Sequence, residues 1–145
     1  EVLQNWESLK KKEGKKSLLE GLPKSLPSLQ RAARIGEKAH RVGFDWHDWQ
    51  GTWKKINEEL NELSSAIEEK NIAHIEHEIG DLLFSICQLS RHLSIQPEDA
   101  HRKAIYRFEE RFKKMEEYFE RQGKEMLSAS EEELDQAWQR AKAGV

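Results

Sequence analysis

Apolar residues recur every three or four positions along most of this chain of 145 residues, which is the spacing that places them on one face of an α-helix. The pattern predicts helices from Ser25 to Gly43, from about Asp45 to Ile67, from about Ile72 to Leu93, from Pro97 to Gly123, and a short one after Ser130. We expect each apolar stripe to point at a core, and we place Trp46, Trp49 and Trp53 in the core or at a dimer interface. Gly80, inside the third helix, predicts close packing against a neighbouring element.

The composition supports an all-α fold, a bundle of about five helices. Charged residues make up 35% of the chain and hydrophobic residues 37%, with 8 Gly and 3 Pro, which favours amphipathic helices over a sandwich or barrel. Residues 1–24 are rich in Lys, and we interpret them as a linker with a helical start around Trp6. Residues 25–145 form the predicted domain. Since the chain opens on Glu1 rather than Met, we expect it to be part of a longer protein.

Charge and cysteine content narrow the classes of function. A net charge of −3 provides no basic field for coating nucleic acid and no polybasic anchor for a membrane, so we expect neither as a partner. No apolar run approaches the roughly 18 residues of a membrane span. The single cysteine, Cys87, cannot form an internal disulfide, which favours a reducing, cytoplasmic location.

Two acidic pairs give the strongest indication of chemistry. Glu59 and Asp81 each lie 11 positions from Lys70, while Glu62 and Glu78 each lie 8 positions from it. If two helices reverse direction near Lys70, residues at equal distances from the turn lie at the same height on both helices. Within each pair the i,i+3 spacing directs both side chains to the same side of their helix. The sequence therefore predicts that four carboxylates meet across a helical hairpin.

Such a cluster needs either protons or a cation. Two like charges about 4 Å apart cost about 4 kcal/mol at an effective dielectric constant of 20. Mg²⁺, or Mn²⁺ as a substitute, suits four carboxylate ligands better than zinc does. His74 and His77 lie close to the second pair, but their spacing is not that of a zinc hydrolase, so we interpret them as surface residues. A solvated acidic surface without any metal is the alternative on spacing alone.

Several ordered strings resemble one enzyme family. Residues 55–62, KINEELNE, and residues 78–84, EIGDLLF, resemble the E-E-x-x-E…E-x-x-D signature of MazG-type nucleoside triphosphate pyrophosphohydrolases. The strings over 22–27, 43–46, 89–93 and 107–112 are similar to family strings in the same order. The segment around Trp6 resembles the stretch that precedes the second of two MazG domains, so the resemblance implies a C-terminal domain. It covers nearly the whole chain.

The resemblance implies a compact all-α homodimer that uses Mg²⁺ to hydrolyse a nucleoside triphosphate to a monophosphate and pyrophosphate. By position, the implied metal ligands are Glu59, Glu62, Glu78 and Asp81. The implied substrate contacts are Lys55, Arg107, Arg111 and Trp138. Glu58 and Glu59 are the implied catalytic residues, with Glu58 a weaker candidate for the base that activates water. The chain departs from the family at His74 and His77, where family members often carry Lys or Glu.

Other interpretations remain open at this point. Lys55 has the i,i+4 spacing of a simple ion-pair partner for Glu59. Arg107 and Arg111 could form an ion-pair edge, and Trp138 could anchor the last helix rather than contact a nucleobase. The substrate could be narrower, such as dUTP or phosphoribosyl-ATP. The chain could also be a non-catalytic helical dimerisation or regulatory module.

Overall fold

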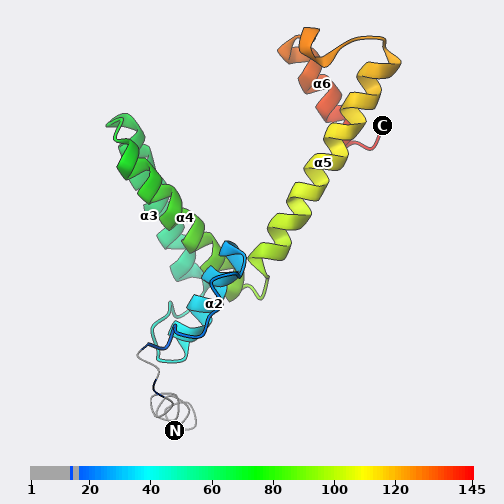
Figure 1. Ribbon diagram of the computed structural model, residues 1–145. Coiled ribbons are helices and arrows are strands. Elements are labelled where there is room, and N and C mark those ends of the chain that lie inside the picture. The colour runs from blue at the N-terminus through cyan, green and yellow to red at the C-terminus, as the bar shows by residue number, and fades with distance from the viewer. Residues whose placement is uncertain (1–13, 15–16) are drawn as a thin grey trace. The chain divides into compact units, whose positions relative to one another are not determined.

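The computed structural model describes residue 14 and residues 17–145, so the expected helical start around Trp6 lies outside the described residues. The helices are α2 (Ser28–His40), α3 (Trp49–Glu68), α4 (Ile72–His92), α5 (Pro97–Arg121), the short 3₁₀ helix η1 (Met126–Ser128) and α6 (Glu131–Lys142) (Figure 1). The described residues include no strand. The predicted all-α class and the order of its helices are confirmed.

The chain divides between Asp99 and Ala100 into two compact units. The first contains α2, α3 and α4, and the second contains most of α5 together with η1 and α6. Across residue 14 and residues 17–145, none of the helices has the length and apolar character needed to cross a membrane.

In the first unit, α3 and α4 lie side by side as an antiparallel hairpin (Figure 1). The predicted reversal is confirmed, since Lys70 adopts a left-handed backbone conformation with a φ of 56°. Asn71 then starts α4, because its side-chain oxygen accepts a hydrogen bond of 3.1 Å from the backbone N–H of His74. At the start of α3, a side-chain oxygen of Asp48 accepts a hydrogen bond of 3.1 Å from the backbone N–H of Gly51 and caps the helix in the same way.

Helix α2 packs against α4, and Gly36 is the residue that permits this contact. A Cβ atom at Gly36 would lie 1.8 Å from the Gln88 side-chain oxygen. The Gln88 amide donates a 2.9 Å hydrogen bond to the carbonyl oxygen of Ala32 on α2. The close packing predicted at Gly80 is wrong, because a Cβ atom there would meet no other atom within 4 Å.

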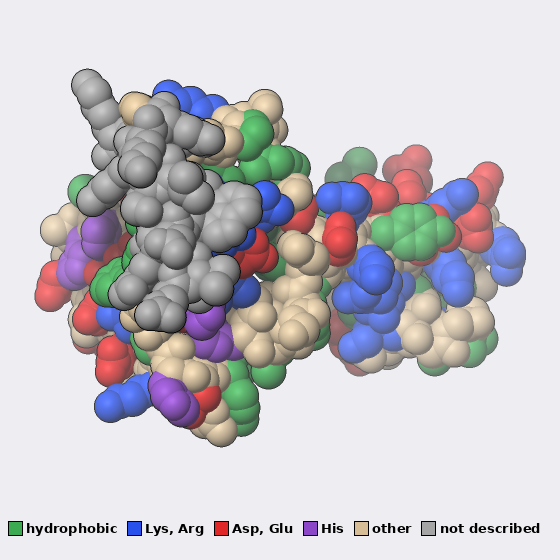
Figure 2. Space-filling view, turned by 90° about the horizontal axis from the view of Figure 1, so that it is seen from below, with side chains coloured by type: hydrophobic (Ala, Val, Ile, Leu, Met, Phe, Trp, Pro, Cys, Tyr) green, Lys and Arg blue, Asp and Glu red, His purple; other side chains and the backbone are tan. Residues whose placement is uncertain are grey.

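The side chains buried in α3 and α4 are mostly small or polar rather than large and apolar. They are Thr52, Ile56, Glu59 and Ala66 on α3, and Glu78, Ser85, Cys87 and Gln88 on α4. Much of the apolar stripe on each helix is exposed, including Trp49, Trp53, Leu60 and Ile67 on α3 and Ile79, Leu83 and Ile86 on α4. The expectation that these stripes face a core within the chain is therefore wrong for most of their residues. Figure 2 shows apolar side chains, in green, open at the surface among charged ones.

In the second unit, α6 lies beside α5, and their shared core contains Met115, Phe119, Ala137 and Ala141. The predicted end of the fourth helix is confirmed, because α5 ends at Arg121 and Gly123 has a φ of 63°. The predicted start of the last helix after Ser130 is confirmed as well, since the backbone N–H of Glu133 donates a 3.1 Å hydrogen bond to the Ser130 hydroxyl, which caps α6.

Candidate metal centre

Three of the four expected acids come together where α3 and α4 face each other. Glu59 on α3 and Glu78 and Asp81 on α4 each offer an oxygen, and these oxygens lie within 4.8 Å of one another. Glu59 and Glu78 are only 3% and 4% exposed, whereas Asp81 is exposed. Two buried carboxylates at one point of a helical hairpin require specific partners, because burying an unpaired charge is costly.

Each buried glutamate has one oxygen engaged and one without a partner. The Lys55 ammonium lies 2.7 Å from Glu59 Oε1. The His74 Nε2 atom lies 3.1 Å from Glu78 Oε1. The remaining atoms, Glu59 Oε2 and Glu78 Oε2, are buried and meet no hydrogen-bond donor among the described residues. Since an unsatisfied buried carboxylate oxygen is destabilising, the free oxygens fit the demand of a hard cation for oxygen ligands.

The two glutamates differ in how readily they hold a proton. The hydrogen bond from Lys55 lowers the pKa of Glu59 below its ordinary value, although burial opposes it. Burial raises the pKa of Glu78, and the neighbouring Glu59 and Glu62 raise it further. A bound divalent cation would favour the ionised form of both glutamates, and so it would oppose the raised pKa of Glu78.

The fourth expected acid, Glu62, is exposed on α3 and lies outside the group of three. Its negative charge nevertheless helps to raise the pKa of Glu78, so it belongs to the same electrostatic environment. Glu58 is half exposed, and one of its oxygens lies 3.9 Å from the Lys55 nitrogen. The Lys55 contacts match the ion-pair alternative drawn from its spacing, and a contact with substrate stays a prediction.

The remaining expected substrate residues lie in the second unit. Arg107 is exposed, and the Arg111 guanidinium lies 5.8 Å from the centre of the Trp138 ring system. The Phe108 ring lies 5.3 Å from that of Trp138, which is partly buried. These contacts fit an anchoring role for Trp138, and its proposed contact with a nucleobase is a separate prediction.

The two histidines near the acids have different environments. His77 fits the expected surface position, since its side chain is 67% exposed while it lies 3.0 Å from Asp81 Oδ2. His74 is only 39% exposed, and its partner Glu78 is buried. The interpretation of His74 as an ordinary surface residue missed this contact. The signal was its i,i+4 spacing from Glu78, the same spacing that relates Lys55 to Glu59.

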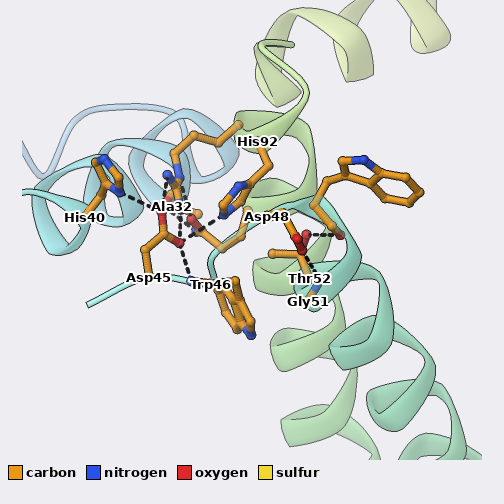
Figure 3. A network of polar contacts seen from close by, with 11 residues as sticks. Ala32, His40, Asp45, Trp46, Asp48, Gly51, Thr52 and His92 are labelled. Carbon is orange, nitrogen blue, oxygen red and sulfur yellow. Dashed lines mark hydrogen bonds and ion pairs between the residues drawn. The ribbon is translucent and has the colours of Figure 1, made fainter. Parts of the chain in front are cut away.

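A second polar network lies where the α2–α3 loop meets α4, and the sequence did not reveal it. Asp45, whose side chain is 6% exposed, accepts hydrogen bonds of 2.9 and 2.6 Å from the Arg91 guanidinium. His92 Nε2 and His40 Nδ1 lie 3.0 and 3.1 Å from the same carboxylate. Figure 3 shows Asp45 between the two histidines. Burial raises the pKa of Asp45, but the hydrogen bonds and charges of Arg91 and His92 outweigh it and lower the pKa to about 2.

Known proteins resemble the chain over most of its length. A family model, the MazG nucleotide pyrophosphohydrolase domain, matches residues 49–116. The chain is 48% identical over 142 residues to the nucleoside triphosphate pyrophosphohydrolase/pyrophosphatase MazG of Thermotoga maritima, covering 96% of the chain and 54% of that protein. It is 36% identical over 148 residues to the nucleoside triphosphate pyrophosphohydrolase of Escherichia coli, covering 98% and 56%. The chain thus spans about half the length of these two relatives.

Proposed function

We propose that this chain is a MazG-family nucleoside triphosphate pyrophosphohydrolase that depends on Mg²⁺, because the family model matches residues 49–116 and two nucleoside triphosphate pyrophosphohydrolases match most of the chain. The observation that carries the proposal is the pair of buried, unpartnered oxygens, Glu59 Oε2 and Glu78 Oε2, beside the exposed Asp81. All three ligands are carboxylates, a donor set that suits Mg²⁺ or Mn²⁺ rather than zinc. Glu62 would join them as the fourth ligand, because it follows Glu59 by three residues on α3 and its charge already acts on Glu78.

The proposed reaction is hydrolysis at the α-phosphorus. The oxygen of a water molecule forms a bond to this phosphorus, and the bond from the phosphorus to the oxygen that bridges the α- and β-phosphates breaks. The bonding electrons leave with pyrophosphate, and a proton from the water passes to a base. When bound, the cation would neutralise phosphate charge and orient the reacting groups.

Of the two acids expected to be catalytic, Glu58 and Glu59, the exposed one is better placed to take a proton from water. Glu59 is buried, and its hydrogen bond with Lys55 lowers its pKa, which weakens it as a proton acceptor. Glu58 is half exposed, so water reaches it directly. We therefore assign proton acceptance to Glu58 and metal binding to Glu59.

Four basic and aromatic residues would each be a nucleotide contact within its own unit. Lys55 is 39% exposed beside the acids, so its ammonium is accessible to a phosphate while it holds Glu59. Arg107 and Arg111 are one turn apart on α5, and guanidinium groups suit phosphate oxygens. Trp138 offers an aromatic ring for stacking on a base. These roles rest on the family resemblance.

The exposed apolar faces of α3 and α4 support a homodimer. Large exposed apolar surfaces commonly mark protein–protein contacts, and the hairpin exposes Trp53, Leu60, Ile67, Ile79 and Leu83. A second copy would cover the same residues on both chains through a two-fold interface. We also keep a cytoplasmic location as a proposal, which the single buried, free thiol of Cys87 favours.

A panel of nucleotides tests the proposed function. The purified chain should release pyrophosphate and a nucleoside monophosphate in the presence of Mg²⁺ and neither product without it. Including dUTP and phosphoribosyl-ATP distinguishes a broad enzyme from a narrow one. Release of orthophosphate alone, or no product from any nucleotide, would contradict the proposal and favour a non-catalytic module.

Variants of single acids connect the activity to the site. Glu59→Gln and Asp81→Asn should each lower the rate by at least 100-fold, because each removes a charged ligand while keeping the shape of the side chain. Glu76→Gln is the matched control, since Glu76 is an exposed acid on α4 to which we assign no role. Equal rates for Glu59→Gln and Glu76→Gln would show that the buried carboxylate does not serve the reaction.

A further inference from the structure

We propose that His74 is a positioning residue of the metal centre, which holds Glu78 Oε1 so that Glu78 presents Oε2 alone to the cation. This inference rests on the proposed function, because it requires a divalent ion at the carboxylates. It assigns a role to a residue that its spacing alone had placed among ordinary surface residues.

The backbone and side chain of His74 are both fixed by their surroundings. Its backbone N–H donates to the Asn71 side chain over 3.1 Å, within the cap of α4. Its Nε2 atom lies 3.1 Å from Glu78 Oε1, and its Nδ1 atom lies 3.8 Å from a carboxylate oxygen of Glu69 at the end of α3. The imidazole therefore extends from the turn of the hairpin to the buried glutamate. With the proton on Nε2, it donates a hydrogen bond to the ionised carboxylate.

The same arrangement occurs on the facing helix, where Lys55 holds Glu59 Oε1 over 2.7 Å. In both cases a basic side chain one turn earlier engages Oε1, while Oε2 is buried and no donor reaches it from the part of the chain that the structure describes. Each glutamate thus has a single oxygen left for a ligand. Groups that hydrogen-bond to a ligating side chain fix its orientation, and losing one typically weakens metal binding about 10- to 100-fold.

His77 provides an internal comparison on the same helix. It has the same i,i+4 relation to Asp81 and a similar distance of 3.0 Å. However, its side chain is 67% exposed and that of Asp81 is 50% exposed, whereas Glu78 is 5% exposed. Water competes for the hydrogen bond of an exposed pair, so the contact constrains Asp81 far less.

Binding of Mn²⁺ alone to the full chain, followed by electron paramagnetic resonance of the free ion, tests the inference without any substrate. His74→Ala and His74→Asn should weaken Mn²⁺ binding about 10- to 100-fold, since alanine has no donor and the asparagine side chain is too short to reach Glu78. His74→Gln should stay within about threefold of the unchanged chain, because the glutamine amide places a donor near the position of Nε2. His77→Ala should also stay within about threefold. The melting temperatures of the metal-free variants establish that each is folded.

The outcomes separate this inference from the proposed function. Binding by His74→Ala or His74→Asn within threefold of the unchanged chain would overturn the role of His74 and leave the metal centre in place. A loss with His74→Gln as large as that with His74→Ala would show that the hydrogen bond is not the cause. Absence of Mn²⁺ binding by the unchanged chain would overturn the metal centre itself, and the inference with it.

Discussion

Replacing Asp45 with asparagine removes the carboxylate that joins the α2–α3 loop to α4. The side chains that face this carboxylate are Arg91 and His92 from α4 and His40 from the end of α2. The Arg91 side chain is 13% exposed, so the change leaves a largely buried guanidinium without its counter-charge. We expect Asp45→Asn to lower the free energy of unfolding by about 3 kcal/mol near neutral pH.

The same carboxylate should make stability depend on pH in the acidic range. The pKa of Asp45 falls from its ordinary value of 3.8 to about 2 in the folded chain, despite the opposing effect of burial, because of the bonds to Arg91 and His92. One pKa unit corresponds to about 1.4 kcal/mol, so the ionised group contributes about 1 to 2 kcal/mol after allowance for solvent screening. Because the folded pKa is the lower one, this contribution is present above pH 3.8 and is lost as the pH falls through 2.

Urea unfolding at a series of pH values between 6 and 2.5 measures this contribution for the original chain and for Asp45→Asn. Other carboxyl groups titrate in both chains, so their effects largely cancel in the difference. We expect the difference in unfolding free energy to shrink toward low pH, with roughly half of the pH-dependent part lost by pH 3. A difference that stays constant across the range would refute the assignment of a strongly lowered pKa to Asp45.

Two further predictions concern packing in each unit. Gly36→Ala should destabilise the chain by about 1 to 3 kcal/mol in urea unfolding, because the added Cβ would overlap Gln88. Gly80→Ala should instead stabilise the chain by up to about 1 kcal/mol, because alanine favours a helix over glycine and the added Cβ has open space. A stabilising effect of Gly36→Ala would contradict the α2–α4 packing. In thermal unfolding, Phe119→Ala should lower the stability of the second unit by about 3 to 5 kcal/mol, because it removes a buried core side chain. Leu127→Ala is the control and should change the stability by no more than about 0.5 kcal/mol, because Leu127 is fully exposed.

Features that depend on nearby residues could be predicted from the sequence. The reversal at Lys70, the end of α5 before Gly123 and the cap at Ser130 follow from backbone preferences within a few residues. The proximity of Glu59 and Asp81 could also be predicted, because the rise per residue is the same in both helices and residues at equal distances from the turn therefore lie at equal heights.

Features that depend on distant residues could not be predicted in this way. Asp45 meets Arg91 across 46 positions, and nothing in the spacing of either residue indicates the other. Gly36 and Gly80 look alike as single glycines inside helices, but only Gly36 faces a neighbouring helix closely. Periodicity shows which residues share one side of a helix, and it does not show what lies opposite.

The faces of α3 and α4 that meet inside the hairpin decide whether the acids of the candidate metal centre are buried or exposed. If the apolar stripes of α3 and α4 faced each other, residues such as Leu60 and Ile79 would be buried and the acids would lie in water. The hairpin instead buries Glu59 and Glu78 and leaves those apolar residues exposed. This arrangement is costly for the chain alone, because it exposes apolar surface and desolvates carboxylates at once. Both costs decrease if a divalent ion binds the acids and a second copy covers the stripes. Metal binding and dimerisation would then each stabilise the same helix arrangement, so removing either should weaken the other.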